Sequence, residues 1–320
     1  MSKRRYERSA VYLLLALLSI ACADGKKGKK ERKSAKADGW SVPGELPLRG
    51  LAKTGAFGDS RLTEASGAVA STRESGVFWS QNDSGNDATL FAYDSLGEPR
   101  GMVRVQNARN TDWEALALGP CESGSCVFIG DVGDNKAARS DVQVWRIPEP
   151  SISQTVSEAP TLLRIKYPGG ARDVEAMWVA PDTSVWFATK RPSRDANGAL
   201  RPSQLYRVPA AAWASGEVAT AALTDSLPIV PGTSVSRDWV TDAALSAVTT
   251  DGRRRLAILT YGSVYVFDAD PVTGRPGAQV ARCAVPSGKR YAEGITWLPD
   301  GRLMLVNEGR GATLYFGRCP

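Results

Sequence analysis

The chain of 320 residues contains no histidine. Without an imidazole, the usual Ser–His–Asp and Cys–His arrangements for activating a nucleophile are excluded. The five cysteines include no C-x-x-C pair, so a zinc site of the common thiolate and imidazole type is disfavoured. A metal ion bound by this chain would therefore be a hard cation held by oxygen ligands.

The body of the chain also lacks excess positive charge. The formal net charge is +6, of which residues 1–22 carry +3 and residues 23–40 carry +4, so the remainder sums to −1. A near-neutral body removes the main electrostatic reason for proposing nucleic-acid binding. The lysines of residues 23–40 suit a solvated tether beside an anionic membrane surface.

The N-terminus reads as a targeting segment. Basic residues from Lys3 to Arg8 precede the apolar run 11–20, which is too short to span a bilayer with ease. Ser19-Ile20-Ala21-Cys22 then resembles a bacterial lipobox, in which Cys22 is lipidated. An ordinary cleavage near Ala21 or Ala23 and an uncleaved anchor helix are the alternatives. We predict a lipoprotein signal peptide over residues 1–21, a lipidated cysteine and basic tether over 22–40, and a folded domain over 41–320.

This leader predicts a monomeric protein of the cell envelope, anchored to a membrane by lipid, on the outer membrane or its periplasmic face. The four other cysteines then form disulfides, Cys121 with Cys126 and Cys283 with Cys319. The second pair raises a conflict. If both cysteines belong to the first and last strands of one blade, they lie roughly 14 Å apart, whereas a disulfide needs about 4.4–6.8 Å. Either the C-terminus folds back or the strands of the last repeat are assigned wrongly.

The body is built from a repeat. Each copy has a strand that opens with an acidic or polar residue, a turn, a strongly apolar strand and an aromatic-rich strand. A further short strand, such as 101–106 or 161–167, lies between copies and is assigned here to the start of the next blade. The opening residues are 48, 61, 67 and 51 positions apart, and they are Ser66, Glu114, Glu175, Asp242 and Glu293. Four antiparallel strands repeated five times predict an all-β propeller with five blades. Six blades are the alternative, and residues 42–51 are a candidate extra strand of the last blade.

Alternation of strand direction places the acidic strand starts and the polar turns after the next strands on one face of the disc. Several carboxylates near one axis repel each other unless a cation or arginines intervene. We therefore predict a divalent cation, foremost Ca²⁺. The alternative is that each carboxylate only hydrogen-bonds neighbouring turn amides. The candidate metal ligands are Asp112, Glu114, Asp173, Glu175, Asp242 and Glu293.

The same face is expected to collect polar turns and cations that would bind an anionic ligand, a phosphate or a carboxylate. The alternative is that the basic groups neutralise the acidic ring, above all Arg191 and Arg237. The candidate ligand-binding residues are Asn82, Asp83, Asp131, Asp134, Lys190, Arg191, Arg237, Lys289 and Arg290.

The motifs N-D-S-G (82–85), D-W-E-A (112–115), G-D-x-G-D-N (130–135), T-K-R (189–191) and E-G (293–294) resemble those of a largely uncharacterised family of secreted bacterial propellers. The resemblance runs from about residue 60 to the end and implies the propeller fold without an agreed activity. More distantly, the chain is similar to phytase-like, esterase-like propellers and calcium-dependent lactonohydrolases, which place acidic residues around a central Ca²⁺. Only Glu114, Glu175, Asp242 and Glu293 can be carried over from them, and the histidine general base of the lactonohydrolases is absent.

Three functions compete at this point. The first is a non-catalytic propeller that binds a divalent cation and an anionic small molecule or an envelope protein. The second is a calcium-dependent phosphoesterase or esterase, in which a metal-activated water attacks the substrate. The third is a structural scaffold of the envelope.

Overall fold

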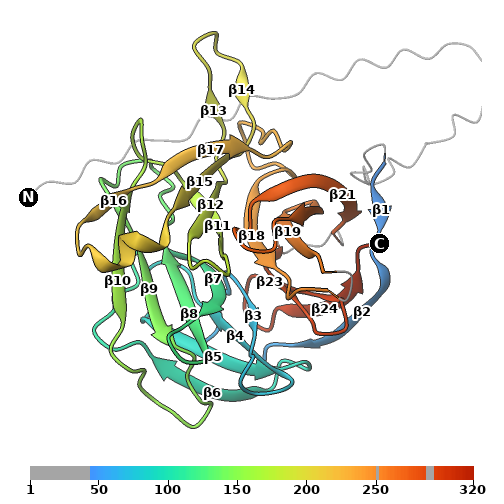
Figure 1. Cartoon of the computed structure of the whole chain (residues 1–320). Helices are drawn as coiled ribbons and strands as arrows, with labels where there is room; N and C mark the ends of the chain where they lie inside the picture. The colour runs from blue at the N-terminus through green and yellow to red at the C-terminus, as the bar shows by residue number, and fades with distance from the viewer. Residues whose placement is uncertain (1–43, 250–251, 286–291) are drawn as a thin grey trace, which may run out of the picture. The chain divides into compact units, whose positions relative to one another are not determined.

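The computed structural model describes residues 44–249, 252–285 and 292–320, all of them in the compact unit Gly39–Pro320. The described chain is an all-β propeller of five blades, with one short 3-10 helix, η1 (Ala210–Ala214) (Figure 1). None of its helical segments has the length and apolar character needed to cross a membrane. The predicted signal peptide, Cys22 and the tether, as well as Lys289 and Arg290, lie outside the described residues.

Each blade is an antiparallel sheet whose strands follow one another outward from the axis. The first blade contains β3 (Val69–Ala70), β4 (Val77–Gln81), β5 (Thr89–Asp94) and β6 (Pro99–Arg104). The second contains β7 (Trp113–Pro120), β8 (Ser125–Asp131), β9 (Val142–Pro148) and β10 (Thr161–Lys166). The third contains β11 (Val174–Val179), β12 (Val185–Thr189), β15 (Gln204–Val208) and β17 (Ala222–Ser226). The fourth contains β18 (Val240–Leu245), β19 (Arg254–Thr260), β20 (Ser263–Ala269) and β21 (Pro276–Ala284). The fifth contains β22 (Ala292–Trp297), β23 (Leu303–Asn307), β24 (Thr313–Arg318) and, from the N-terminal end, β2 (Arg49–Ala56).

Three further elements decorate this plan. β1 (Leu46–Pro47) and β16 (Val218–Thr220) each add a parallel strand, to β21 and β10 respectively. β13 (Ser193–Arg194) and β14 (Leu200–Arg201) form a separate two-stranded hairpin. The five-blade prediction is confirmed, and two blades carry one parallel strand more than the predicted four.

Burial explains which strands lie inside. Every residue of β11 is buried, and this strand contacts the first strands of the neighbouring blades. The outer strand β10 instead alternates exposed and buried residues in its second half, as expected for a strand with one solvated face.

The order of strands within a blade differs from the sequence prediction. The strands around 101–106 and 161–167 were assigned to the start of the following blade, but β6 and β10 are the outermost strands of the preceding one. The acidic strand is therefore the innermost of its blade. Within a blade the chain runs from the innermost to the outermost strand. A single connection then leads from the outermost strand to the innermost strand of the next blade.

The ring is closed by the N-terminal end of the described chain. β2 pairs antiparallel with β24, with Ala52 opposite Phe316 (Figure 1). The expected extra strand of the last blade is thus present, although it spans Arg49–Ala56 rather than 42–51.

Both predicted disulfides are present. Cys121 and Cys126 join β7 to β8 across their turn, with Cα atoms 5.3 Å apart. Cys283 and Cys319 lie 5.8 Å apart because Cys283 belongs to β21 of the fourth blade and Cys319 follows β24 of the fifth. The prediction that both belong to the last blade is wrong, and with it the conflict disappears.

These two bridges should differ in their effect on stability. The chain-entropy relation gives about 4 kcal/mol for the separation of 36 residues in one bridge and about 2 kcal/mol for the separation of 5 in the other. We expect Cys283→Ala/Cys319→Ala to lower the free energy of unfolding more than Cys121→Ala/Cys126→Ala, measured by urea denaturation of the oxidised proteins. Equal losses would show that the inter-blade bridge adds nothing beyond a local turn.

Candidate cation site

A β-bulge at the start of the inner strand positions the acidic residues. In four blades the pairing with the second strand skips one residue at this place, between Trp113 and Ala115 in the first case. Such a residue is released from the regular alternation, so its side chain can be directed elsewhere. The skipped residues are Glu114, Glu175, Thr241 and Glu293.

The bulges surround a small cavity of about 130 Å³ at one end of the inner strands. Among the described residues its lining is strongly acidic and includes a single basic side chain. The lining residues are Glu64, Ala65, Ser66, Asp83, Glu114, Asn135, Glu175, Lys190, Tyr261, Glu293 and Glu308. The predicted meeting of strand starts and polar turns at one end of the disc is therefore confirmed.

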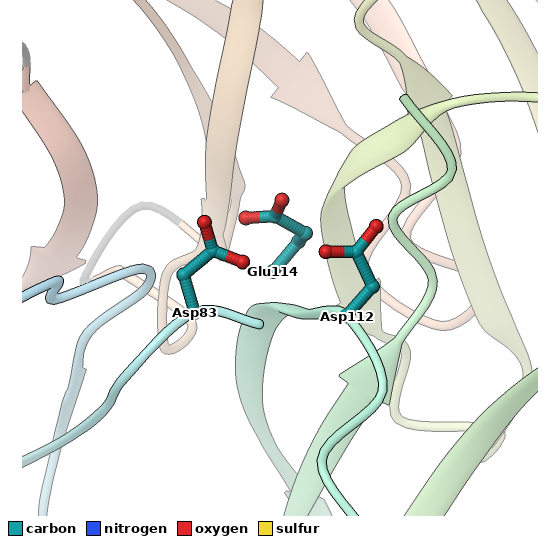
Figure 2. Close-up of side chains that lie close together, drawn as sticks. All are labelled: Asp83, Asp112 and Glu114. Carbon is teal, nitrogen blue, oxygen red and sulfur yellow. The ribbon is translucent and has the colours of Figure 1, made fainter. Parts of the chain in front are cut away.

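Three carboxylates converge beside this cavity, and two of them, Asp83 and Glu114, line it. Asp83 follows β4, while Asp112 and Glu114 come from the start of β7, and Figure 2 shows their carboxylates directed toward one another. One oxygen of each lies within 4.8 Å of the others. The amide of Asn110 donates to the carbonyl oxygens of Asn82 and Asp83, at 3.0 and 2.8 Å, and so holds the two loops together.

Close packing of this cluster depends on Gly133. A Cβ atom at this position would lie 2.6 Å from the carboxyl carbon of Asp112 and 2.7 Å from Cγ of Glu114. A larger residue would push both carboxylates away from their present positions. The glycine of the G-D-x-G-D-N turn therefore serves the geometry of the cluster.

Burial and mutual repulsion disfavour the ionised form of these groups. The pKa of Asp112 is raised to about 7, first by burial and then by the charges of Asp83 and Asp173. Burial and the charge of Glu175 likewise raise the pKa of Glu114 well above its usual value. A cation among these oxygens would relieve the repulsion and favour ionisation.

Lys190 balances part of the charge from the other side of the cavity. Its ammonium group forms an ion pair with Oε1 of Glu175, and both side chains are buried. The second oxygens, Oε2, of Glu175 and Glu293 are buried without a hydrogen-bond partner among the described residues. The pKa of Glu293 is raised to about 7, with burial as the largest cause.

Comparison with known proteins leaves the activity open. No protein-family profile and no curated protein matches the chain. A gluconolactonase from Xanthomonas campestris aligns over 84% of this chain and 89% of its own, with 13% identity and a TM-score of 0.44. A soluble aldose sugar dehydrogenase from Escherichia coli aligns over 83% and 98%, with 11% identity and a TM-score of 0.44. At TM-scores below 0.5 these likenesses carry no argument about function, and the likeness to phytase-like propellers stays a prediction.

The predicted turn ligands divide into one that lines the cavity and three that do not. Asp83 lines it. Oδ1 of Asn82 accepts the N–H groups of residues 63 and 64. Asp131 is fully buried and accepts the N–H of Asp112 while pairing with Arg139 at 2.8 Å. Asp134 accepts two N–H groups of its own turn. These last three side chains shape the loops that carry the cluster.

Asp242 is likewise a structural group. It is fully buried, and its carboxylate accepts the N–H groups of Ala243 and Ile295, the latter at 2.8 Å. Thr241, one residue earlier, takes the bulge position in this blade and bonds the carbonyl oxygen of Ala292. Asp242 is therefore absent from the cavity lining, and the alignment of the acidic column was one residue off in this blade.

The predicted cationic residues Arg191 and Arg237 are held in ion pairs outside the cavity lining. Arg191 bonds Asp173 at 2.7 Å and lies 4.5 Å from the ring centre of Trp239. Arg237 bonds Glu45 at 2.6 Å. Arg191 thus has the neutralising arrangement that the sequence offered as the alternative, whereas the partner of Arg237 is not one of the predicted ring carboxylates. Asp173 also accepts the N–H of residue 134, so it supports the cluster from behind.

Six lining residues are not among the ligands expected from the sequence: Glu64, Ala65, Ser66, Asn135, Tyr261 and Glu308. Signals for two of them were present. Glu64 stands two residues before Ser66, as Asp112 does before Glu114, and Glu308 directly follows the fifth-blade strand β23. A β-sheet pattern cannot show which of two such carboxylates turns toward the axis, because the bulge decides it.

A larger cleft of about 980 Å³ lies at the other ends of β7 and β8, beside the Cys121–Cys126 bridge. Its buried carboxylate, Glu149, already accepts hydrogen bonds from the hydroxyl groups of Ser71, Thr72 and Ser125. Cleft size alone therefore does not identify a site, whereas the small acidic cavity combines convergence with unsatisfied oxygens.

Proposed function

We propose that this protein is a lipid-anchored propeller of the cell envelope that binds a divalent cation, foremost Ca²⁺, in its acidic cavity. The observation that supports the proposal best is the convergence of Asp83, Asp112 and Glu114, whose ligand oxygens lie within 4.8 Å of one another. The anchor itself is supported by the lipobox-like sequence ending at Cys22 and by the basic tether.

The donor set fits calcium better than other ions. Three carboxylates supply hard oxygen ligands, and the hydroxyl of Ser66 beside Glu114 offers a neutral one. Calcium accepts six to eight oxygens in irregular arrangements, while Mg²⁺ demands a near-ideal octahedron. Softer ions prefer imidazole or thiolate ligands, which this cavity lacks among its described lining residues.

The remaining coordination positions of a bound ion would face the cavity and take water or an anionic group. We infer that a carboxylate or phosphate of a small molecule or an envelope protein is bound in this way. The protein is proposed to act as a monomer. It is also proposed to act without catalysis, because the chain has no histidine and the described lining of the cavity offers no activated nucleophile.

A second candidate function rests on Glu293. A cavity carboxyl with a pKa of about 7 can accept a proton near neutral pH, as a general base beside a metal-bound water requires. This favours a calcium-dependent phosphoesterase or esterase. Hydrolysis of an aryl ester or aryl phosphate that is abolished by Glu293→Gln would promote this candidate over the binding protein.

Glu114→Gln tests the proposed cation site. It removes one of the three converging charges and should weaken Ca²⁺ binding by about tenfold or more, measured by isothermal titration of the full chain in detergent. Asp300→Asn is the matched control, because Asp300 pairs with Arg302 in an exposed hairpin. An absence of calcium binding by the wild type, or equal affinity of Glu114→Gln, would refute the proposal.

A further inference from the structure

The ammonium group of Lys190 supplies a positive charge of the protein itself to the acidic cavity. It directly follows β12, its N–H donates to the carbonyl oxygen of Asp173 at 3.0 Å, and its side chain is 9% exposed. The ammonium group pairs with Glu175 and lies 5.1 Å from the ring centre of Tyr261 and 5.8 Å from that of Trp239. Carboxylate on one side and aromatic faces on the other make a compact cation-binding position.

The surroundings of Lys190 offer more negative charge than one ammonium group neutralises. Glu175 and Glu293 each keep a buried Oε2 atom that has no hydrogen-bond partner in the described part of the chain. Both residues occupy bulge positions, in the third and the fifth blade, and both line the cavity. Buried carboxylate oxygens without a partner are rare and indicate a place where a cation or water is bound.

This position is distinct from the cluster of Asp83, Asp112 and Glu114. The cluster is built by the first two blades, whereas Glu175 and Glu293 come from the third and the fifth. In the described structure, no lysine or arginine forms an ion pair with the cluster of Asp83, Asp112 and Glu114. Lys190 instead balances part of the negative charge of the second group, Glu175 and Glu293.

We propose that Lys190 fills a second cation position of the cavity, between Glu175 and Glu293, and thereby limits the wild-type protein to one divalent ion. Removing the ammonium group opens that position, and a second divalent ion with oxygen ligands binds there. The inference rests on the proposed function for the first ion only. The second position depends on the contacts of Lys190 and on the unpartnered oxygens of Glu175 and Glu293.

Counting bound ions in wild type and Lys190→Gln tests this inference. The full-length proteins are equilibrated with CaCl₂, freed of excess ion by dialysis, and analysed by inductively coupled plasma mass spectrometry. We expect the stoichiometry to rise from about one to about two ions per chain. Lys136→Gln is the matched control, because it removes the same charge from an exposed residue directly after the turn 130–135. It should leave the number of bound ions unchanged.

The possible outcomes separate the two proposals. A count that rises from none to one supports the role of Lys190 and overturns the proposed wild-type cation site. A count that stays at one overturns the role of Lys190 and leaves the wild-type site standing. No ion in either protein refutes both, and an equal rise in Lys136→Gln refutes the role of Lys190, because any lost positive charge would then suffice.

Lys190→Gln leaves Glu175 without its partner and could unfold. Thermal melts with and without CaCl₂ cover this case, since an ion that binds only the folded state raises its stability by mass action. We expect calcium to raise the melting temperature of Lys190→Gln by more than that of the wild type. A variant that gains no more than the wild type, or that stays unfolded with calcium, overturns the proposal.

Discussion

Replacing Asp242 by alanine is expected to lower the free energy of unfolding by about 3–5 kcal/mol. The carboxylate is fully buried in β18 and accepts N–H groups from its own strand and from β22 of the next blade. Alanine removes the acceptor and leaves these N–H groups buried without partners. Chemical denaturation followed by tryptophan fluorescence measures the loss.

The same variant separates a structural from a ligand role. If Asp242 only joins two blades, its alanine variant should bind Ca²⁺ with nearly wild-type affinity wherever it is folded, and Asp242→Asn should recover part of the stability. Calcium affinity that falls as strongly as in Glu114→Gln would instead place Asp242 among the ligands, as the sequence pattern suggested.

The affinity for Ca²⁺ should rise by about 10–100-fold between about pH 6 and about pH 8. Asp112 in the cluster and Glu293 in the cavity lining each have a pKa raised to about 7, and the pKa of Glu114 is raised well above its usual value. An ion that binds to Asp112 and Glu114 must therefore displace protons below that pH. Asp112 faces Asp83, Asp173 and Arg139, and Glu293 faces Lys190, Glu308, Tyr261 and Asp83. Titration calorimetry in buffers of different ionisation enthalpy measures both affinity and proton release.

Without calcium, the stability of the protein should change with pH in the opposite direction. Because these two pKa values are raised in the folded state from 3.8 and 4.5, the folded chain holds more protons than the unfolded chain between those values and about pH 7. The free energy of unfolding of the calcium-free protein therefore falls as the pH rises through this window. A calcium-free protein that is more stable at about pH 8 than at about pH 5.5 would contradict the raised pKa values.

The sequence was sufficient to predict the repeat, the blade number and the face on which the acidic residues gather. These three predictions depend on the spacing of the repeat and on the alternating direction of successive strands. Both can be recognised in a sequence of short apolar strands bounded by Gly and Asp turns. Asp112 and Glu114, both predicted as metal ligands, lie close together, and Asp83, which the sequence assigned to an anionic ligand, joins them. Lys190, selected for an anionic ligand, lines the cavity but pairs with Glu175 instead.

The error at Asp242 has a clear physical cause. A β-bulge adds one residue to a strand, and one residue decides which side of the sheet a side chain faces. In the fourth blade the bulge falls on Thr241, so the acidic residue beside it, Asp242, turns into the blade interface. Asp131 and Asp134 lie outside the cavity lining for a different reason, because Asp suits turn amides as well as cations.

Closure of the ring by β2 constrains how the chain can fold while it is being made or exported. The partner of β2 is the last strand of the chain, and the hydrogen bond from Thr54 to Leu314 joins residues 260 positions apart. Pairing over such a separation is slow, because the intervening chain must be ordered first. A chain delivered N-terminus first would hold β2 as an unpaired edge until its final residues emerge, and during that interval it would need protection from association with other chains.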